Sequence, residues 1–169
     1  MKISMLHSDT GVDFLAMRTV VVMLIAAALI AMSAVYVNGY VAGFSKDKAR
    51  QEVNRITEAS RAEYAESCPD GGDGVSIDVA IPQCVRRAVF GGSPGNGSMI
   101  RRDAHVYYVE YADGSCETHV LDARFAYGND TGHVASDDPV VLYPGSYLLN
   151  VKAETVNGSI MAAIYGGSR

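Results

Sequence analysis

Residues 91–95 read Gly-Gly-Ser-Pro-Gly and match the G-x-S-x-G pattern that hydrolases use to present a nucleophilic serine. That chemistry needs a strand before the serine and a helix after it, so that the hydroxyl projects from a sharp turn. Pro94 and the glycines around it disfavour a regular helix, because proline lacks an N–H and glycine loses much backbone entropy. The sequence therefore predicts a loop over residues 91–98 and no catalytic serine.

His105 and His119 are the histidines that could hold a metal, because they flank a hairpin turn signal, Asp-Gly at 113–114. Paired strands would bring the two imidazoles near each other, where Asp103 or Glu117 could complete a site. No spacing in this set is diagnostic of a metal. We therefore interpret both residues as ordinary hairpin histidines and expect no metal.

Two loop-like segments, Asn129-Asp130-Thr131 and Ser136-Asp137-Asp138, have oxygen-bearing side chains, and a calcium ion would need several oxygen ligands from one loop. The EF-hand pattern is absent, and solvated turns are the better interpretation. The sequence also has no phosphate-binding loop, dinucleotide fingerprint, zinc ribbon or convincing catalytic triad. We expect a protein that is not an enzyme and has neither a cofactor nor a small-molecule substrate.

Two basic pairs, Arg86-Arg87 and Arg101-Arg102, lie in a chain of net charge −5. They are too few to predict nucleic-acid binding. They could bridge to neighbouring subunits or bind an anionic envelope polymer. Charges on strand edges that discourage aggregation are the simpler explanation.

A long apolar segment lies near the N-terminus, where residues 19–45 carry no charge and Val20–Val37 is an uninterrupted apolar run. About 20 apolar residues cross a bilayer, whereas the apolar part of a cleaved secretion signal has only about 7 to 15. Tyr36 and Tyr40 would lie at the lipid–water interface. We expect a single-pass membrane protein that spans the bilayer at about 19–43. Small residues give this segment a smooth face on which helices can approach closely in lipid, namely Ala26, Ala27, Ala28, Ala31, Ser33 and Ala34.

The sequence carries opposing signals about the side of the membrane on which the C-terminal domain lies. More basic residues follow the apolar segment than precede it, which by the positive-inside rule would place the domain in the cytoplasm. Three Asn-x-Ser/Thr sequons, at Asn96, Asn129 and Asn157, favour the outside and are the candidate N-glycosylation sites. The cysteines also lie only after the apolar segment. We expect the domain to be extracellular.

The three cysteines, Cys68, Cys84 and Cys116, allow three single disulfides and leave one thiol over. Cys68–Cys84 is favoured because it would tie the end of the helix to the nearby strands. Three unrelated reduced thiols are the alternative.

The chain divides into three parts: a polar N-terminus at 1–11, a long helix at 12–66 and a β-rich head at 67–169. After the membrane segment, apolar and small side chains recur at helical spacing, which predicts a stripe that packs on the head. The stripe consists of Ala49, Val53, Ile56, Ser60 and Tyr64. Lys48 and Glu52 lie four residues apart and predict a surface ion pair.

The head is predicted to be an antiparallel sheet or sandwich of six to eight strands, so the fold class is α+β. Alternating and β-rich stretches predict the strands, and Asp-Gly and Asn-Gly dipeptides at 113–114 and 157–158 predict hairpin turns. Residues 126–139 are expected to form a loop. The predicted strands are 75–80, 84–90, 105–111, 116–121, 140–143, 147–155 and 159–165.

This layout resembles the type IV pilin-like membrane proteins of archaea. The resemblance is carried by Gly11-Val12-Asp13-Phe14-Leu15, the run Val20–Val37, the stripe and the Gly- and Tyr-rich strands. It implies leader cleavage after Gly11, with Val12 first in the mature chain. It also implies a subunit of a pilus-like assembly that meets the lipid bilayer and other pilin-like subunits through its membrane helix.

The chain is also similar in layout to accessory proteins of the archaellum, which have one N-terminal membrane helix and an outward β-sandwich. That resemblance implies an anchored protein that binds the cell envelope or a motor complex and needs no cleavage. Asp9-Thr10 stands where pilin leaders carry a basic residue, which favours this second role.

Overall fold

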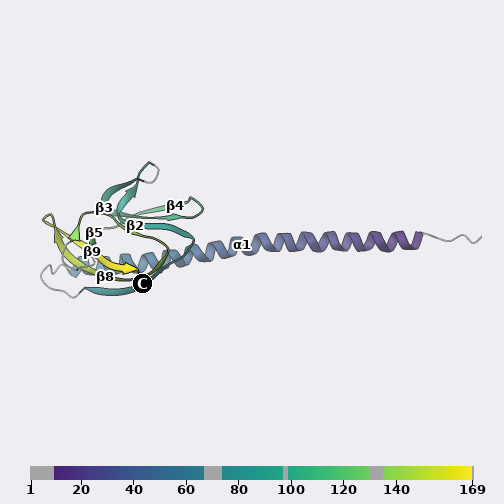
Figure 1. The fold of residues 1–169 in the computed structure, drawn as a ribbon, viewed down its shortest axis with the longest axis horizontal. Coiled ribbons are helices and arrows are strands. Elements are labelled where there is room, and N and C mark those ends of the chain that lie inside the picture. The colour runs from purple at the N-terminus through teal and green to yellow at the C-terminus, as the bar shows by residue number, and fades with distance from the viewer. Residues whose placement is uncertain (1–9, 67–73, 97–98, 130–134, 169) are drawn as a thin grey trace, which may run out of the picture. The chain divides into compact units, whose positions relative to one another are not determined.

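A computed structural model describes residues 10–66, 74–96, 99–129 and 135–168, without the side chains of 10–16, 38, 42 and 167–168. The chain divides into two units, Met1–Gly43 and Phe44–Arg169. Helix α1 (Thr10–Glu66) contributes residues to both units. The predicted arrangement of one long apolar N-terminal helix followed by a β domain is confirmed (Figure 1).

The first unit consists of the apolar part of α1. Leu24, Ile30 and Tyr36 are 65%, 71% and 79% exposed. Residues six apart point about 120° from one another on a helix, so apolar side chains cover all sides of this segment. The Ser33 hydroxyl donates to the Leu29 carbonyl at 2.8 Å and is thereby satisfied within the helix. Within the described residues, α1 is the one helix long and apolar enough to cross a membrane.

In the second unit, the remaining part of α1 packs on the β domain through the predicted stripe. Ala49, Val53, Ile56 and Ser60 are buried, and Tyr64 is half-buried against the same core. The Ser60 hydroxyl donates to the Ile56 carbonyl at 2.9 Å, so this buried polar group is satisfied.

The predicted ion pair between Lys48 and Glu52 is wrong. Glu52 lies 3.1 Å from Arg55 Nη1, and the same carboxylate oxygen lies 3.4 Å from the backbone nitrogen of Ala80. Glu52 is therefore turned toward the β domain, whereas Lys48 is exposed to solvent.

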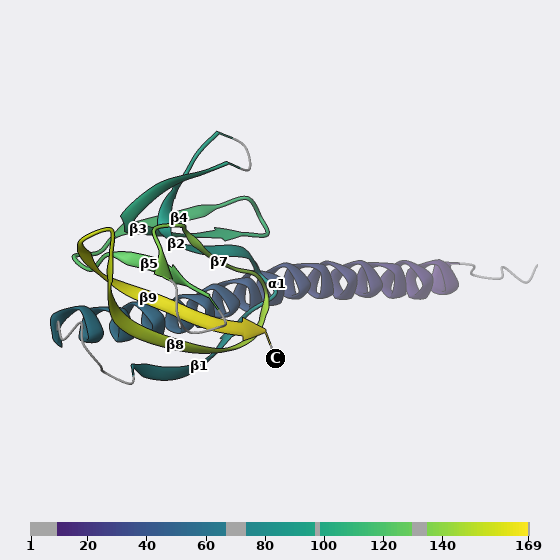
Figure 2. The ribbon, with the colours of Figure 1, turned by 60° about the vertical axis from the view of Figure 1, so that its left-hand side comes forward.

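The described part of the β domain contains nine strands in two sheets, more than the six to eight predicted (Figure 2). One sheet has the order β1-β8-β9-β5-β6 and the other β4-β3-β2-β7. The strands are β1 (Val75–Ile81), β2 (Val85–Pro94), β3 (Ile100–Tyr111), β4 (Cys116–Val120), β5 (Phe125–Gly128), β6 (Ala135–Ser136), β7 (Val140–Leu142), β8 (Gly145–Val156) and β9 (Ser159–Ser168).

A single core joins α1 to both sheets. Ile56 of α1 lies in one buried cluster with Val151 of β8 and Phe90 of β2. Phe90 stacks on Tyr107 with ring centroids 5.9 Å apart, and Phe125 meets Phe90 edge-on at 5.4 Å. The contact of Phe90 with Phe125 joins the β4-β3-β2-β7 sheet to β5 of the other sheet.

Two expectations about the strands are wrong. The predicted loop at 91–98 starts later, because β2 continues through Pro94 with Ser93 opposite Arg101. A bulge at Gly91, which has a φ of 79°, lets the strand bend and continue. The predicted loop at 126–139 contains most of β5 and all of β6, and β5 pairs with β9 in parallel, so the domain is not purely antiparallel.

Candidate functional site

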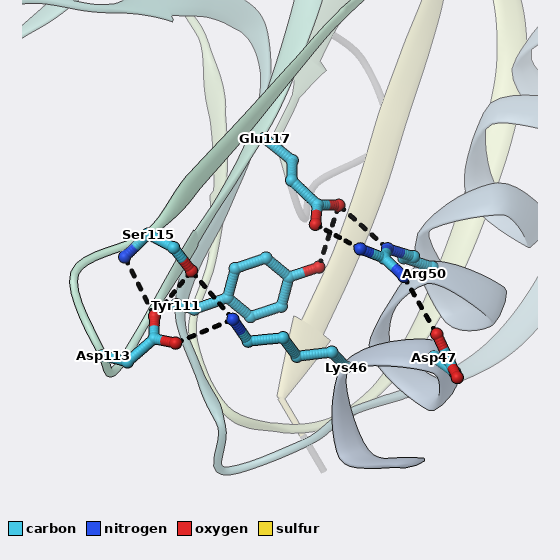
Figure 3. Close-up of polar contacts among 7 residues, drawn as sticks. All are labelled: Lys46, Asp47, Arg50, Tyr111, Asp113, Ser115 and Glu117. Carbon is cyan, nitrogen blue, oxygen red and sulfur yellow. Dashed lines mark hydrogen bonds and ion pairs between the residues drawn. The ribbon is translucent and has the colours of Figure 1, made fainter. Parts of the chain in front are cut away.

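A connected group of polar contacts lies where α1 meets the hairpin of β3 and β4 (Figure 3). We call it the helix–hairpin cluster. It consists of Lys46, Asp47 and Arg50 from α1 and Tyr111, Asp113, Ser115 and Glu117 from the hairpin.

The turn between β3 and β4 positions the hairpin side of the cluster. Gly114 has a φ of 84°, a conformation that L-residues rarely adopt. The Gly114 N–H donates to the Tyr111 carbonyl at 3.0 Å, and the Ser115 N–H donates to Asp113 Oδ1 at 2.9 Å. The Asp-Gly dipeptide therefore forms the predicted hairpin turn and fixes the Asp113 carboxylate.

Lys46 binds this turn. Its ammonium lies 2.7 Å from Asp113 Oδ2 and 3.0 Å from the Ser115 hydroxyl. The same ammonium lies 4.7 Å from the centre of the Tyr111 ring, which adds a cation–π contact. The hydrogen bond from Lys46 is the main reason why the pKa of Asp113 lies well below its ordinary value of 3.8.

Arg50 makes the second connection. Its Nε donates to Glu117 Oε2 at 3.0 Å and its Nη2 donates to Glu117 Oε1, which is the bidentate geometry that suits a guanidinium and a carboxylate. Arg50 Nη1 also lies 2.9 Å from Asp47 Oδ1. The hydrogen bond from Arg50 is the main cause of the lowered pKa of Glu117.

Tyr111 completes the cluster by donating its hydroxyl to Glu117 Oε2 at 3.1 Å. Burial, together with the charge of Glu117, raises the pKa of Tyr111 to about 12. The phenol therefore stays protonated at neutral pH and serves as a hydrogen-bond donor. The carboxylates of the cluster accept hydrogen bonds from within the chain, so the arrangement suits holding two elements together.

A pocket of about 150 Å³ adjoins the cluster, and Val53, Asn54, Tyr107 and His119 contribute to its lining. Binding sites for drug-sized ligands have volumes of about 300 to 1,000 Å³. The pocket is therefore of a size for one side chain or a few water molecules.

The two histidines considered as metal ligands have separate roles. His105 accepts a hydrogen bond at Nε2 from Arg124 Nε at 3.2 Å, so its Nδ1 donates to the Leu121 carbonyl at 3.3 Å. His119 stacks on Tyr107 with ring centroids 5.0 Å apart. Within the described residues, no group of three or more His, Cys, Asp or Glu side chains could hold a metal ion.

Three of the four arginines considered as binding sites, and both acidic residues of 136–138, form ion pairs within the chain. Arg102 pairs with Asp137 at 3.4 Å and with Asp138. Glu110 forms ion pairs with two arginines. Its Oε1 lies 2.8 Å from Arg86 Nη1, and its Oε2 lies 2.6 Å from Arg87 Nε. Of the segment 129–131 considered as a calcium loop, residues 130 and 131 lie outside the described residues.

The structure places the candidate glycosylation and cleavage sites. Asn96, Asn129 and Asn157 are exposed, and Asn157 lies in the hairpin turn between β8 and β9 with a φ of 51°. Gly11, the predicted cleavage position, lies in the first turn of α1. Glycosylation and cleavage stay predictions.

The predicted disulfide involves a residue that lies outside the described part of the chain, Cys68. Its predicted partner Cys84 carries a free, half-buried thiol, and Cys116 carries a free, exposed thiol. Burial is the main reason why the pKa of the Cys84 thiol is raised.

The helix–hairpin cluster was not predicted from the sequence. Lys46 and Arg50 lie four apart on the helix, as do Asp113 and Glu117 along the hairpin, but such spacing is common among surface charges. Only the pairing of distant segments shows that these charges meet.

Comparison with protein-family models, with curated proteins and with solved structures finds no match to this chain.

Proposed function

We propose that this chain is a membrane-anchored, non-catalytic surface protein that acts as a structural subunit of a type IV pilin-like assembly. The proposal is based on the difference between the two parts of α1. Its first part exposes apolar side chains on all sides, whereas Ala49, Val53 and Ile56 of its second part are fully or almost fully buried in the β domain. A helix that is apolar on every side fits lipid or other membrane helices, and a helix with one buried stripe fits a folded head.

The helix–hairpin cluster supports a mechanical role. An anchored subunit must keep its head attached to its helix, and two charge-assisted contacts, Lys46–Asp113 and Arg50–Glu117, join these elements. Each connects residues far apart in the chain, so each resists separation of the hairpin from α1. The lipid bilayer and other pilin-like subunits are the proposed partners of the apolar part.

An extracellular position for the β domain belongs to the same proposal. Exposure of Asn96, Asn129 and Asn157 is compatible with glycan attachment at all three sequons. A glycan is bulky and polar and requires a site that faces solvent.

The test is the intact mass and N-terminal sequence of the protein isolated from its native membranes. A mature chain that begins at Val12 would support pilin processing, and Gly11→Leu should then block it. A chain that retains Met1 would contradict the pilin assignment and support the accessory role, in which an anchored protein binds the envelope or a motor complex. Mass in excess of the polypeptide at the sequons would support the extracellular position.

A further inference from the structure

Strand β4 is an edge strand whose outer edge is not covered by another described strand. It ends the sheet β4-β3-β2-β7 and pairs with β3 alone among the described strands. Cys116 and Thr118 are exposed, and Val120 is 74% exposed. Proteins usually guard such an edge with lysine, proline, a bulge or a covering segment. The β4 sequence, Cys-Glu-Thr-His-Val, has neither lysine nor proline, and its one acidic residue, Glu117, is held by Arg50 of α1.

The other three sheet edges are short or have a backbone group engaged by a side chain. At the end of β7, the Tyr147 hydroxyl occupies both the N–H of Tyr143, at 3.2 Å, and its carbonyl, at 2.9 Å. On β1, the backbone nitrogen of Ala80 faces the Glu52 carboxylate at 3.4 Å. Strand β6 has two residues. The contrast singles out β4 as the edge open to strand addition.

The register of β3 and β4 identifies the free backbone groups. Tyr111 N donates to the Ser115 carbonyl at 2.8 Å, and Leu121 N donates to the His105 carbonyl at 2.7 Å. Hydrogen-bonded positions alternate along an antiparallel ladder, so Glu117 also directs its backbone groups toward β3. The backbone groups of the residues between, Cys116, Thr118 and Val120, therefore point to the open edge.

We propose that β4 pairs with β4 of a second copy of this chain, antiparallel and centred on Thr118. In this register Thr118 faces its own copy and Cys116 faces Val120. Glu117 faces His119 of the other copy, and the β-branched Thr118 side chains placed opposite each other stabilise a sheet. A shift of the centre to residue 117 would oppose two Glu117 carboxylates, which is unfavourable.

The pocket beside the cluster lies on the face of β4 that carries Glu117 and His119. Glu117 and His119 contribute to its lining together with Arg50 and Asn54. His119 of the second copy, placed opposite Glu117, would lie at this pocket. The side chains on the other face, Thr118 and Val120, would shield each other from water.

The direction of β4 sets the relation between the two copies. Lys46 contacts Asp113 and Arg50 contacts Glu117, so α1 and the hairpin advance in the same direction at this point (Figure 3). Antiparallel β4 strands therefore reverse the β domain of the second copy relative to that of the first. The inference does not depend on whether the chain is pilin-like.

Disulfide trapping of the full chain in detergent micelles tests the register. Val120→Cys should form a disulfide-linked dimer with Cys116 of the other copy, and Thr118→Cys should link to itself. The wild-type chain should not link through Cys116, because the two Cys116 residues would lie roughly 14 Å apart and a disulfide spans Cα atoms no more than about 7 Å apart. Leu148→Cys, on the exposed face of β8, is the control and should give no dimer.

Charge substitutions test whether the partner is a second copy. Thr118→Lys, added to Val120→Cys, should lower the cross-linked fraction by about fivefold or more, because two lysines would face each other. Thr118→Glu should do the same, and a mixture of the two variants should restore the dimer. Thr155→Lys, at an exposed position of β8, should have no effect.

Three results would overturn the proposal. The first is no dimer with Val120→Cys, the second is equal trapping with Leu148→Cys, and the third is a mixture of the two charge variants that links no better than either alone. Circular dichroism of each variant checks that the fold is retained. Leader cleavage or its absence has no bearing on these readouts, so they fail or succeed separately from the proposed function.

Discussion

Arg50 and Glu117 lie 67 residues apart in the chain, yet Arg50 Nε lies 3.0 Å from Glu117 Oε2. The side chain of Arg50 is 51% exposed and that of Glu117 is 27% exposed, so water and salt weaken their attraction. The bidentate geometry and the added hydrogen bond from Tyr111 make this pair stronger than most surface pairs. It is one of the two ion pairs that join α1 to the β3–β4 hairpin.

Acid should weaken the fold through this cluster. The folded state lowers the pKa of Glu117 below its ordinary value of 4.5 and that of Asp113 below 3.8. Their stabilisation is thus complete above these values and is lost as the pH falls through the lower, folded-state values. Urea unfolding in detergent between pH 7 and pH 2 should show that the free energy of unfolding decreases once the pH is below about 4.5. The decrease should be less steep for Glu117→Gln than for the wild type. Glu58→Gln, an exposed acid on α1, is the control. Equal acid sensitivity of Glu117→Gln and the wild type would contradict this role.

Ile56→Ala should cost about 2 to 5 kcal/mol of unfolding free energy, because it removes buried methyl groups and leaves a cavity in the core that joins α1 to both sheets. Thermal or urea unfolding of the β domain followed by circular dichroism measures the loss. Glu58→Ala, at an exposed position two residues after Ile56, should change stability by less than about 0.5 kcal/mol. A loss of that small size for Ile56→Ala would show that the stripe does not hold the head.

Gly128→Ala should destabilise the β domain by about 1 to 3 kcal/mol, because a methyl group there would overlap a close-packed ring. The Cβ would lie only 2.4 Å from Cγ of Tyr165. Replacing the ring with a smaller side chain, Tyr165→Leu, should recover part of the loss when combined with Gly128→Ala. If the double variant were no better than the sum of the two single variants, the ring would not be the cause.

The free thiols report on sidedness. Cys116 is exposed, whereas Cys84 is half-buried and has a raised thiol pKa. Because the thiolate is the reactive form, Cys116 should react with a maleimide faster than Cys84. A membrane-impermeant maleimide added to intact cells should label Cys116 if the β domain is outside. Labelling only after lysis would place the domain in the cytoplasm, and Cys116→Ser controls for other sites.

The sequence correctly predicted the helix and the two hairpin turns, because each depends on a pattern within one short segment. The apolar run in α1 and the stripe through Ala49, Val53 and Ile56 have helical spacing, and the turns at Asp113-Gly114 and Asn157-Gly158 depend on residues that accept unusual backbone angles. The strand β5 was missed because Phe-Ala-Tyr-Gly is short and lacks alternation, and its parallel pairing with β9 depends on a distant segment.

What the sequence determined by itself is the presence of a long apolar helix, a stripe on its second part and a β domain, because each follows from the order of neighbouring side chains. What only the tertiary structure decided is which distant charges meet and which strand edge stays open. Lys46 and Asp113 could each have faced water, and β4 could have been an inner strand. Their positions follow from the packing of α1 and two sheets around one core, and that packing depends on contacts between residues far apart in the chain.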